Sequence, residues 1–166
     1  QSVCTLCLEG FKAAIHIACI FYMGIERDAF ITSLSKFTQL STLRDMNGKN
    51  VLVINTLLNI AVTEANFLQS TWNQVLTCIS QVERLRLIST GVHDESQYFG
   101  GNAPKPRALP AHRGADEEKS AVFLAPADSK EDAMRIMSEI NESYIEAIFI
   151  NSQHYNSECI VDFVNE

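Results

Sequence analysis

The longest apolar run of this chain lies near its start, from Ala13 to Ile25, and only His16 breaks its apolar character. A helix with this composition has no polar face to turn toward water, so neighbours are expected to bury it on several sides. The run therefore predicts a central helix of an all-helical domain. It is shorter than the roughly 20 apolar residues that a membrane-spanning helix needs. We therefore expect no transmembrane or signal segment.

Apolar residues at helical spacing continue through the first half of the chain. The second predicted helix carries a stripe formed by Phe30, Leu34, Phe37 and Leu40. Asn47-Gly48 signals a turn, and Thr71-Trp72-Asn73-Gln74 fits a capping box that opens the fourth helix. The predicted helices span about Val3–Met23, Arg27–Leu40, Asn50–Ala65 and Thr71–Gly91.

The composition changes between Val92 and Pro126, where all four prolines of the chain occur. Such a segment has little apolar surface to bury, so we predict a disordered insert over 92–126. Periodicity then resumes in one long helix, about Lys130–Asn151, whose stripe is Ile136, Ile140, Tyr144 and Ile148. A last helix begins near Ser157.

Helices joined antiparallel by short links suggest a fragment of a HEAT-like or armadillo-like solenoid with about five to six helices. We expect residues 1–91 to form a four-helix antiparallel core, with two C-terminal helices of 127–166 packing on it in the same domain. No clean internal repeat is visible, so the solenoid is a structural inference. The chain lacks a starting methionine. Because both ends also fall within expected helices, we expect it to be cut from a larger protein.

The composition fits one ordinary domain, with 46% hydrophobic and 20% charged residues. Five cysteines form an odd set, which favours free thiols in a reducing, cytosolic setting. The net charge is −7, and residues 127–166 hold two Lys/Arg against nine Asp/Glu. No cluster of four or more Lys/Arg occurs. The charge pattern therefore favours neither nucleic acid nor direct binding to an anionic membrane.

Catalytic and metal chemistry has few candidates. Cys4-Thr5-Leu6-Cys7 has the spacing of a redox or zinc half-site, but it lacks a preceding strand and a second ligand pair. Packing on an apolar helix is therefore the favoured interpretation. His16 has no acidic residue nearby in sequence to orient it, which favours a buried core histidine over a base or metal ligand. We expect no enzyme activity, metal or cofactor, although a Cys/His enzyme stays open as a third hypothesis.

Two groups of residues are candidates for partner binding. The predicted fifth helix has an acidic outer face, formed by Glu131, Glu139, Glu142 and Glu146, which suits a basic partner or is merely solvated. Phe67 and Trp72 flank the turn between the third and fourth helices, where aromatic residues form interface hot spots or fix the corner. The partner-binding hypothesis names Phe67, Trp72, Glu139, Glu142 and Glu146.

Six blocks of this sequence carry a family resemblance, in the order Leu8–Phe30, Lys49-Asn50, Ala61–Trp72, Cys78–Glu83, Leu87–Val92 and Cys159–Val164. These blocks resemble the large Arf guanine-nucleotide exchange factors of the trans-Golgi, of the Sec-seven or BIG type. The resemblance is to the first homology region downstream of their catalytic exchange domain. This chain departs from the family pattern at Tyr22, Ala65 and Ser157-Glu158, where the family commonly has glycine or Gly-Asn. Because a left-handed Ala65 would be costly, we expect its backbone to be helical.

The resemblance implies a non-catalytic regulatory domain that controls exchange activity and Golgi recruitment by binding GTP-loaded Arf or the neighbouring exchange domain. It also implies a cytoplasmic protein that associates peripherally with trans-Golgi membranes through these partners. The alternative is a HEAT-like scaffold that only packs against adjacent domains of the same protein. The family's catalytic glutamate belongs to the exchange domain, so no catalytic residue is expected in this chain.

Overall fold

The structure is a computed structural model, and it describes residues 2–38, 46–90 and 128–165. The predicted insert over 92–126 and Leu40 of the second predicted stripe lie outside these residues. The described parts contain α-helices, short 3-10 helices and no strand, which confirms the all-α prediction. The α-helices are α1 (Val3–Ile20), α2 (Gly24–Phe37), α3 (Gly48–Thr63), α4 (Trp72–Ser89), α6 (Asp128–Glu139), α7 (Ser143–Asn151) and α8 (Ser157–Asn165).

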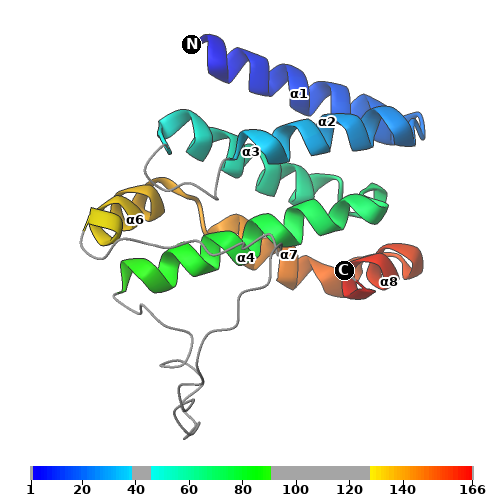
Figure 1. The fold of residues 1–166 in the computed structure, drawn as a ribbon. Helices are drawn as coiled ribbons and strands as arrows, with labels where there is room; N and C mark the ends of the chain where they lie inside the picture. The colour runs from blue at the N-terminus through cyan, green and yellow to red at the C-terminus, as the bar shows by residue number, and fades with distance from the viewer. Residues whose placement is uncertain (1, 39–45, 91–127, 166) are drawn as a thin grey trace, which may run out of the picture.

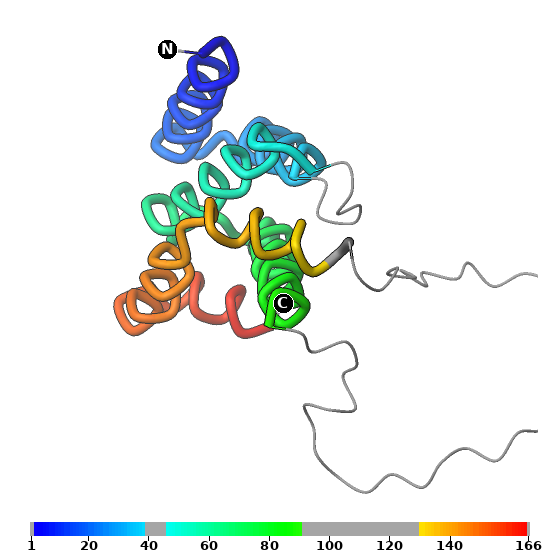
Figure 2. Tube along the Cα trace, turned by 90° about the vertical axis from the view of Figure 1, so that its left-hand side faces the viewer, coloured from blue at the N-terminus to red at the C-terminus, as the bar shows by residue number. Residues whose placement is uncertain are grey.

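The helices stack from α1 at one end of the molecule to α7 and α8 at the other (Figure 1). Helix α3 is central and packs against α1, α2, α4, α6 and α7. Helix α1 packs only on α2 and α3 among the major contacts, and Figure 2 shows it at the edge of the stack. The prediction that the opening run forms the central helix is therefore wrong. Apolar character did not reveal which helix has neighbours on all sides.

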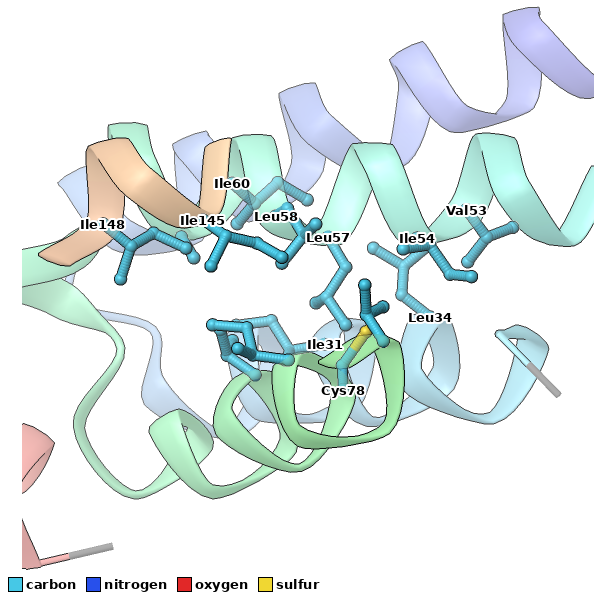
Figure 3. Close-up of a cluster of buried hydrophobic side chains, with 14 of the residues drawn as sticks. Ile31, Leu34, Val53, Ile54, Leu57, Leu58, Ile60, Cys78, Ile145 and Ile148 are labelled. Carbon is cyan, nitrogen blue, oxygen red and sulfur yellow. The ribbon is translucent and has the colours of Figure 1, made fainter. Parts of the chain in front are cut away.

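The core runs without interruption from α1 to α8. Figure 3 shows its middle, where side chains of α2, α3, α4 and α7 meet. Leu57, Leu58 and Ile54 of α3 are completely buried there, together with Ile31 of α2 and Ile148 of α7. Burial of side chains of this size supplies the main stabilising free energy of such a domain.

Helix α1 ends at Ile20, three residues before the predicted end. The Met23 N–H donates to the Ala18 carbonyl and the Tyr22 N–H to the Cys19 carbonyl, which is the hydrogen-bond pattern of a Schellman motif. This motif requires a left-handed residue, and Tyr22 adopts it with φ of 56°. Ala65, in contrast, lies in a short 3-10 helix without positive φ, as expected.

Helix α2 buries a different stripe from the predicted one. Leu34 is buried as expected, but Phe37 is exposed and Phe30 is only half-buried. The buried positions are instead Ile31 and the charged Arg27. The buried face of α2 therefore includes a polar contact, because Arg27 donates to the Gln69 side chain before α4.

The N-terminal caps of α3 and α4 differ from the predicted ones. Asn47 is an N-cap rather than a turn residue, since its side chain accepts from the Lys49 N–H while the Asn50 side chain accepts from the Asn47 N–H. The predicted capping box at Thr71 is wrong. The Thr71 hydroxyl donates to the Leu68 carbonyl, because a 3-10 turn precedes α4 and already continues the helical path.

The predicted long helix Lys130–Asn151 is two helices, α6 and α7, with a break at Ile140–Glu142. Asn55 of α3 stabilises the break: its amide donates to the Glu139 carbonyl at 3.1 Å and accepts from the Asn141 N–H at 2.8 Å. Asn141 in turn accepts from Ser143 at the start of α7. Apolar periodicity did not predict this break, because the side chain that hydrogen-bonds to the backbone there belongs to another helix.

A second asparagine pair fixes the next helix in the same way. Asn66, in the 3-10 helix Ala65–Phe67, accepts from the Asn156 N–H at 2.9 Å. Asn156 caps α8 by accepting from the Cys159 N–H at 2.7 Å. Both C-terminal helices are thus positioned by amide side chains from α3 and its following turn.

Candidate functional site

Trp72 is fully buried, so it is not available to a partner, and the prediction of a binding role for it is wrong. Its ring packs on Tyr155 and Phe163 at centroid distances of 5.7 and 4.9 Å. These residues come from the C-terminal helical segment, which covers the start of α4. Trp72 therefore fixes a corner of the core, the alternative role considered for it.

Phe67 lies at the surface beside the α1–α2 corner. Its ring is half-buried and meets the ring of Tyr22 edge to face at 6.2 Å. Tyr22 and Ile25 are each 84% exposed. Phe21, which directly follows α1, is 69% exposed. An apolar corner of this kind can take part in binding. Phe67 was predicted to bind a partner, but its exposed neighbours were not, because they belong to the apolar run that was expected to be buried.

All four glutamates of the predicted acidic face, Glu131 included, are exposed, but they do not share one helix. Glu139 ends α6, Glu142 lies in the break, and Glu146 is in the first turn of α7. No described Lys or Arg forms an ion pair with them. The acidic surface therefore exists around the α6–α7 break, and it can present negative charge to a basic partner.

A buried charge that sequence analysis did not select lies at the opposite corner. The Arg27 guanidinium, 6% exposed, pairs with Asp28 at 2.7 Å and donates to the Gln69 side chain at 2.9 Å. Gln69 has a left-handed backbone with φ of 48°. The arrangement ties α2 to the turn before α4. It is a structural ion pair, and nothing in the sequence signalled its burial, because Arg27 stands between the charged residues Glu26 and Asp28.

His16 is not a buried core histidine, and that interpretation is wrong. Its side chain is 58% exposed, and its Nδ1 lies 2.8 Å from the Glu64 carboxylate at the end of α3. The orienting acid is 48 residues away in sequence, which is why local inspection missed it. Together with Lys12 and Thr63, the pair lines an open groove of about 490 Å³ between α1 and α3.

The cysteines do not assemble a reactive site in the described residues. Burial, with a smaller contribution from the Glu64 carboxylate, raises the pKa of Cys19 to about 11. Burial also raises the pKa of Cys78 to about 12. Cys4 is half-buried, whereas Cys7 is exposed, so packing does not explain Cys7. The described residues include no group of three metal-ligating side chains.

Cys159 is buried and its thiol lies 3.1 Å from the Ala65 carbonyl, to which it donates. Burial raises the pKa of this thiol, and the Trp72 indole N–H partly opposes the rise. A protonated, buried thiol is a poor nucleophile. The Cys/His enzyme hypothesis thus gains no support from any of the three buried cysteines.

Comparison with known proteins finds relatives over almost the whole chain. It is 34% identical over 191 aligned residues to brefeldin A-inhibited guanine nucleotide-exchange protein 3 of Arabidopsis thaliana, covering 98% of this chain and 11% of that protein. It is 35% identical over 176 aligned residues to brefeldin A-inhibited guanine nucleotide-exchange protein 1 of Homo sapiens, covering 98% and 9%.

The chain thus spans about a tenth of the length of the curated relatives it matches. No family model matches it, and no solved structure matches it. The relatives come from plants and mammals and share one kind of name, which agrees with the family that the sequence blocks resembled. The chain is therefore homologous to one segment of the large guanine-nucleotide exchange proteins of the BIG type.

Proposed function

We propose that this chain is a non-catalytic regulatory domain of a large Arf guanine-nucleotide exchange factor. It controls exchange activity and Golgi recruitment by binding GTP-loaded Arf, the neighbouring exchange domain, or both. The domain acts in the cytoplasm, at the surface of trans-Golgi membranes. The observation that carries the proposal is the match of 98% of the chain to about a tenth of exchange proteins.

The geometry supports a binding role through two exposed surfaces. The acidic surface, defined as Glu139, Glu142 and Glu146, offers unpaired negative charge around the α6–α7 break. The apolar corner, defined as Phe21, Tyr22 and Phe67, offers aromatic surface at the other edge of the domain. Charged residues steer association and aromatic residues anchor it.

The test is retention of Arf on the immobilised chain, with Arf loaded with GTP or with GDP. The proposal expects clearly greater retention of the GTP form. Reversing two charges, with Glu142→Lys and Glu146→Lys together, is expected to lower that retention by roughly tenfold, because close charge pairs contribute more than 1 kcal/mol across an interface. Equal retention of both Arf forms would remove Arf binding from the proposal.

A matched control reverses two exposed charges elsewhere, with Glu26→Lys on α2 and Glu158→Lys on α8. This variant changes net charge by the same amount, so its retention reports general electrostatics. The acidic surface is supported only if the first pair of substitutions has the larger effect. Circular dichroism on both variants verifies that the helices are intact.

The second candidate function is a HEAT-like scaffold that packs only on adjacent domains of the same protein. The large exposed apolar area at the α1 end favours it. A scaffold retains neither form of Arf but binds the isolated exchange domain. Measuring exchange activity with and without added chain separates restraint of the exchange domain from passive packing.

A further inference from the structure

Helix α1 carries a row of exposed residues along its outer side, which we call the outer stripe. Its members follow one another at spacings of three and four, so they share one side of the helix. Leu6 is 61% exposed and Ile17 is 51% exposed. The outer stripe consists of Val3, Leu6, Gly10, Ala13, Ile17 and Ile20.

The outer stripe contains no charged or polar residue, in contrast to an ordinary solvated helix face. The polar residues of α1 occupy a separate narrow strip, formed by Thr5, Glu9, Lys12 and His16. On the other side, Cys7, Ala14 and Phe21 connect the outer stripe with the face that packs on α2 and α3. The apolar surface is therefore continuous with an existing helix interface and covers most of the helix circumference.

The middle of the outer stripe is formed by the two smallest members, Gly10 and Ala13. A Cβ added at Gly10 would have no neighbouring heavy atom within 4 Å. Small residues between larger aliphatic ones allow another helix backbone to approach closely at the crossing point. The spacing, the lack of charge and the small centre together match the packing surface of one further helix.

We propose that the outer stripe of α1 is covered by an α-helix with an uncharged aliphatic face, contributed by another segment of the same longer polypeptide. The stack of Figure 1 then continues beyond α1 by one more layer. The inference rests on the second candidate function, packing on neighbouring segments, and needs no Arf binding. The relatives of this chain carry about nine-tenths of their length outside the matched part. A longer polypeptide of this kind can supply the covering helix.

Two other occupants are less compatible with this surface. A stable dimer buries about 800 Å² on each partner, more than a single stripe with glycine and alanine at its centre supplies. By length and composition α1 could cross a membrane. However, core helices of soluble proteins meet the same criterion, and the inner side of α1 is held by α2 and α3.

The test measures cysteine alkylation at pH 8 by peptide mass spectrometry, in a Cys7→Ser background. It compares this 166-residue chain with the longest polypeptide that its gene encodes. Ile17→Cys reports on the outer stripe, and Lys12→Cys, on the polar strip of the same helix, is the matched control. We expect the longer polypeptide to slow alkylation at Ile17→Cys by roughly tenfold or more and at Lys12→Cys by less than about twofold.

A photo-crosslinker attached at Ile17→Cys then identifies the covering segment. The expected product is an intramolecular crosslink to a helical peptide outside these 166 residues. Equal alkylation of Ile17→Cys in both polypeptides overturns the proposal. Protection of Ile17→Cys that is already present in a dimer of the 166-residue chain overturns it too, and so does protection that appears only with phosphatidylcholine vesicles. Arf retention is measured separately on the same variants, so failure of the Arf-binding proposal leaves this result unaffected.

Discussion

Helices α1 and α3 are both long and strongly apolar, yet the structure buries eight residues of α3 and only four of α1. Helix α3 has neighbours on nearly every side, whereas α1 has α2 and α3 on one side and nothing described on the other. Composition sets how much apolar surface a helix offers. The position of the helix in the stack decides how much of that surface is covered.

The strongest test of this contrast truncates one side chain in each helix. Leu57 of α3 is fully buried, so Leu57→Ala is expected to lower the free energy of unfolding by about 2–5 kcal/mol, through lost burial and a cavity. Ile17→Ala on the outer side of α1 is expected to cost less than about 1 kcal/mol in this chain. Urea denaturation measures both values.

Similar losses for the two variants would contradict the contrast, because they would mean that the outer side of α1 is already packed. Val75→Ala on α4 is a useful additional control, since Val75 is fully buried outside both helices. Its loss should fall between the other two, because valine is smaller than leucine.

A second test concerns polar groups with which α3 positions its neighbours. Asn55→Ala removes both hydrogen bonds at the α6–α7 break, and it is expected to cost about 1–3 kcal/mol, because two backbone groups lose their partner. Hydrogen exchange should increase most at the start of α7. Unchanged protection of α7 would show that packing alone holds the break.

Thr56→Ala is the matched control for this substitution. Thr56 is adjacent in sequence, and its hydroxyl donates only within α3, to the Leu52 carbonyl. Its removal is expected to change the free energy of unfolding by less than about 0.5 kcal/mol, because this bond connects no other element.

The sequence predicted helix positions well where apolar periodicity decides them, although the cap predicted at Thr71 was wrong. It placed α3 and α4 within about two residues and the start of α8 at Ser157. The prediction failed where a residue far away in the sequence determines the local structure. Asn55 breaks the predicted fifth helix from 86 residues away, and Glu64 pairs with His16 across 48 residues.

The candidate surfaces were predictable only in part, for the same reason. The exposure of Glu139, Glu142 and Glu146 followed from their charge. Trp72 could not be placed from sequence, because an aromatic residue beside a turn is either an exposed anchor or a corner of the core. The cover provided by Tyr155 and Phe163 decides its role, and these residues are about 80–90 positions away.

A third test uses the strained end of α1. Tyr22 has a left-handed backbone, which costs a non-glycine residue about 1–2 kcal/mol. Tyr22→Gly removes this strain but also the ring contact with Phe67 and some chain stiffness, so we expect a net stabilisation of about 0.5–1 kcal/mol. Thermal denaturation measures it.

Phe21→Gly provides the control, because Phe21 has φ of −90° and needs no glycine. It should destabilise the chain, through loss of backbone restriction without relief of strain. A destabilising Tyr22→Gly would show that the Tyr22–Phe67 contact contributes more than the backbone strain costs.

The smallest expected effect concerns the buried side of α1, through its cysteine. Cys19 faces the core with its pKa raised to about 11, above the value of 9.0 for an exposed thiol. Between pH 9 and 11 the unfolded chain loses this proton while the folded chain retains it, so stability falls as pH rises. Cys19→Ala should weaken that pH dependence, measured as the urea midpoint at pH 8 and pH 10. An unchanged pH dependence in Cys19→Ala would show that burial on the inner side of α1 does not hold this thiol in its protonated form.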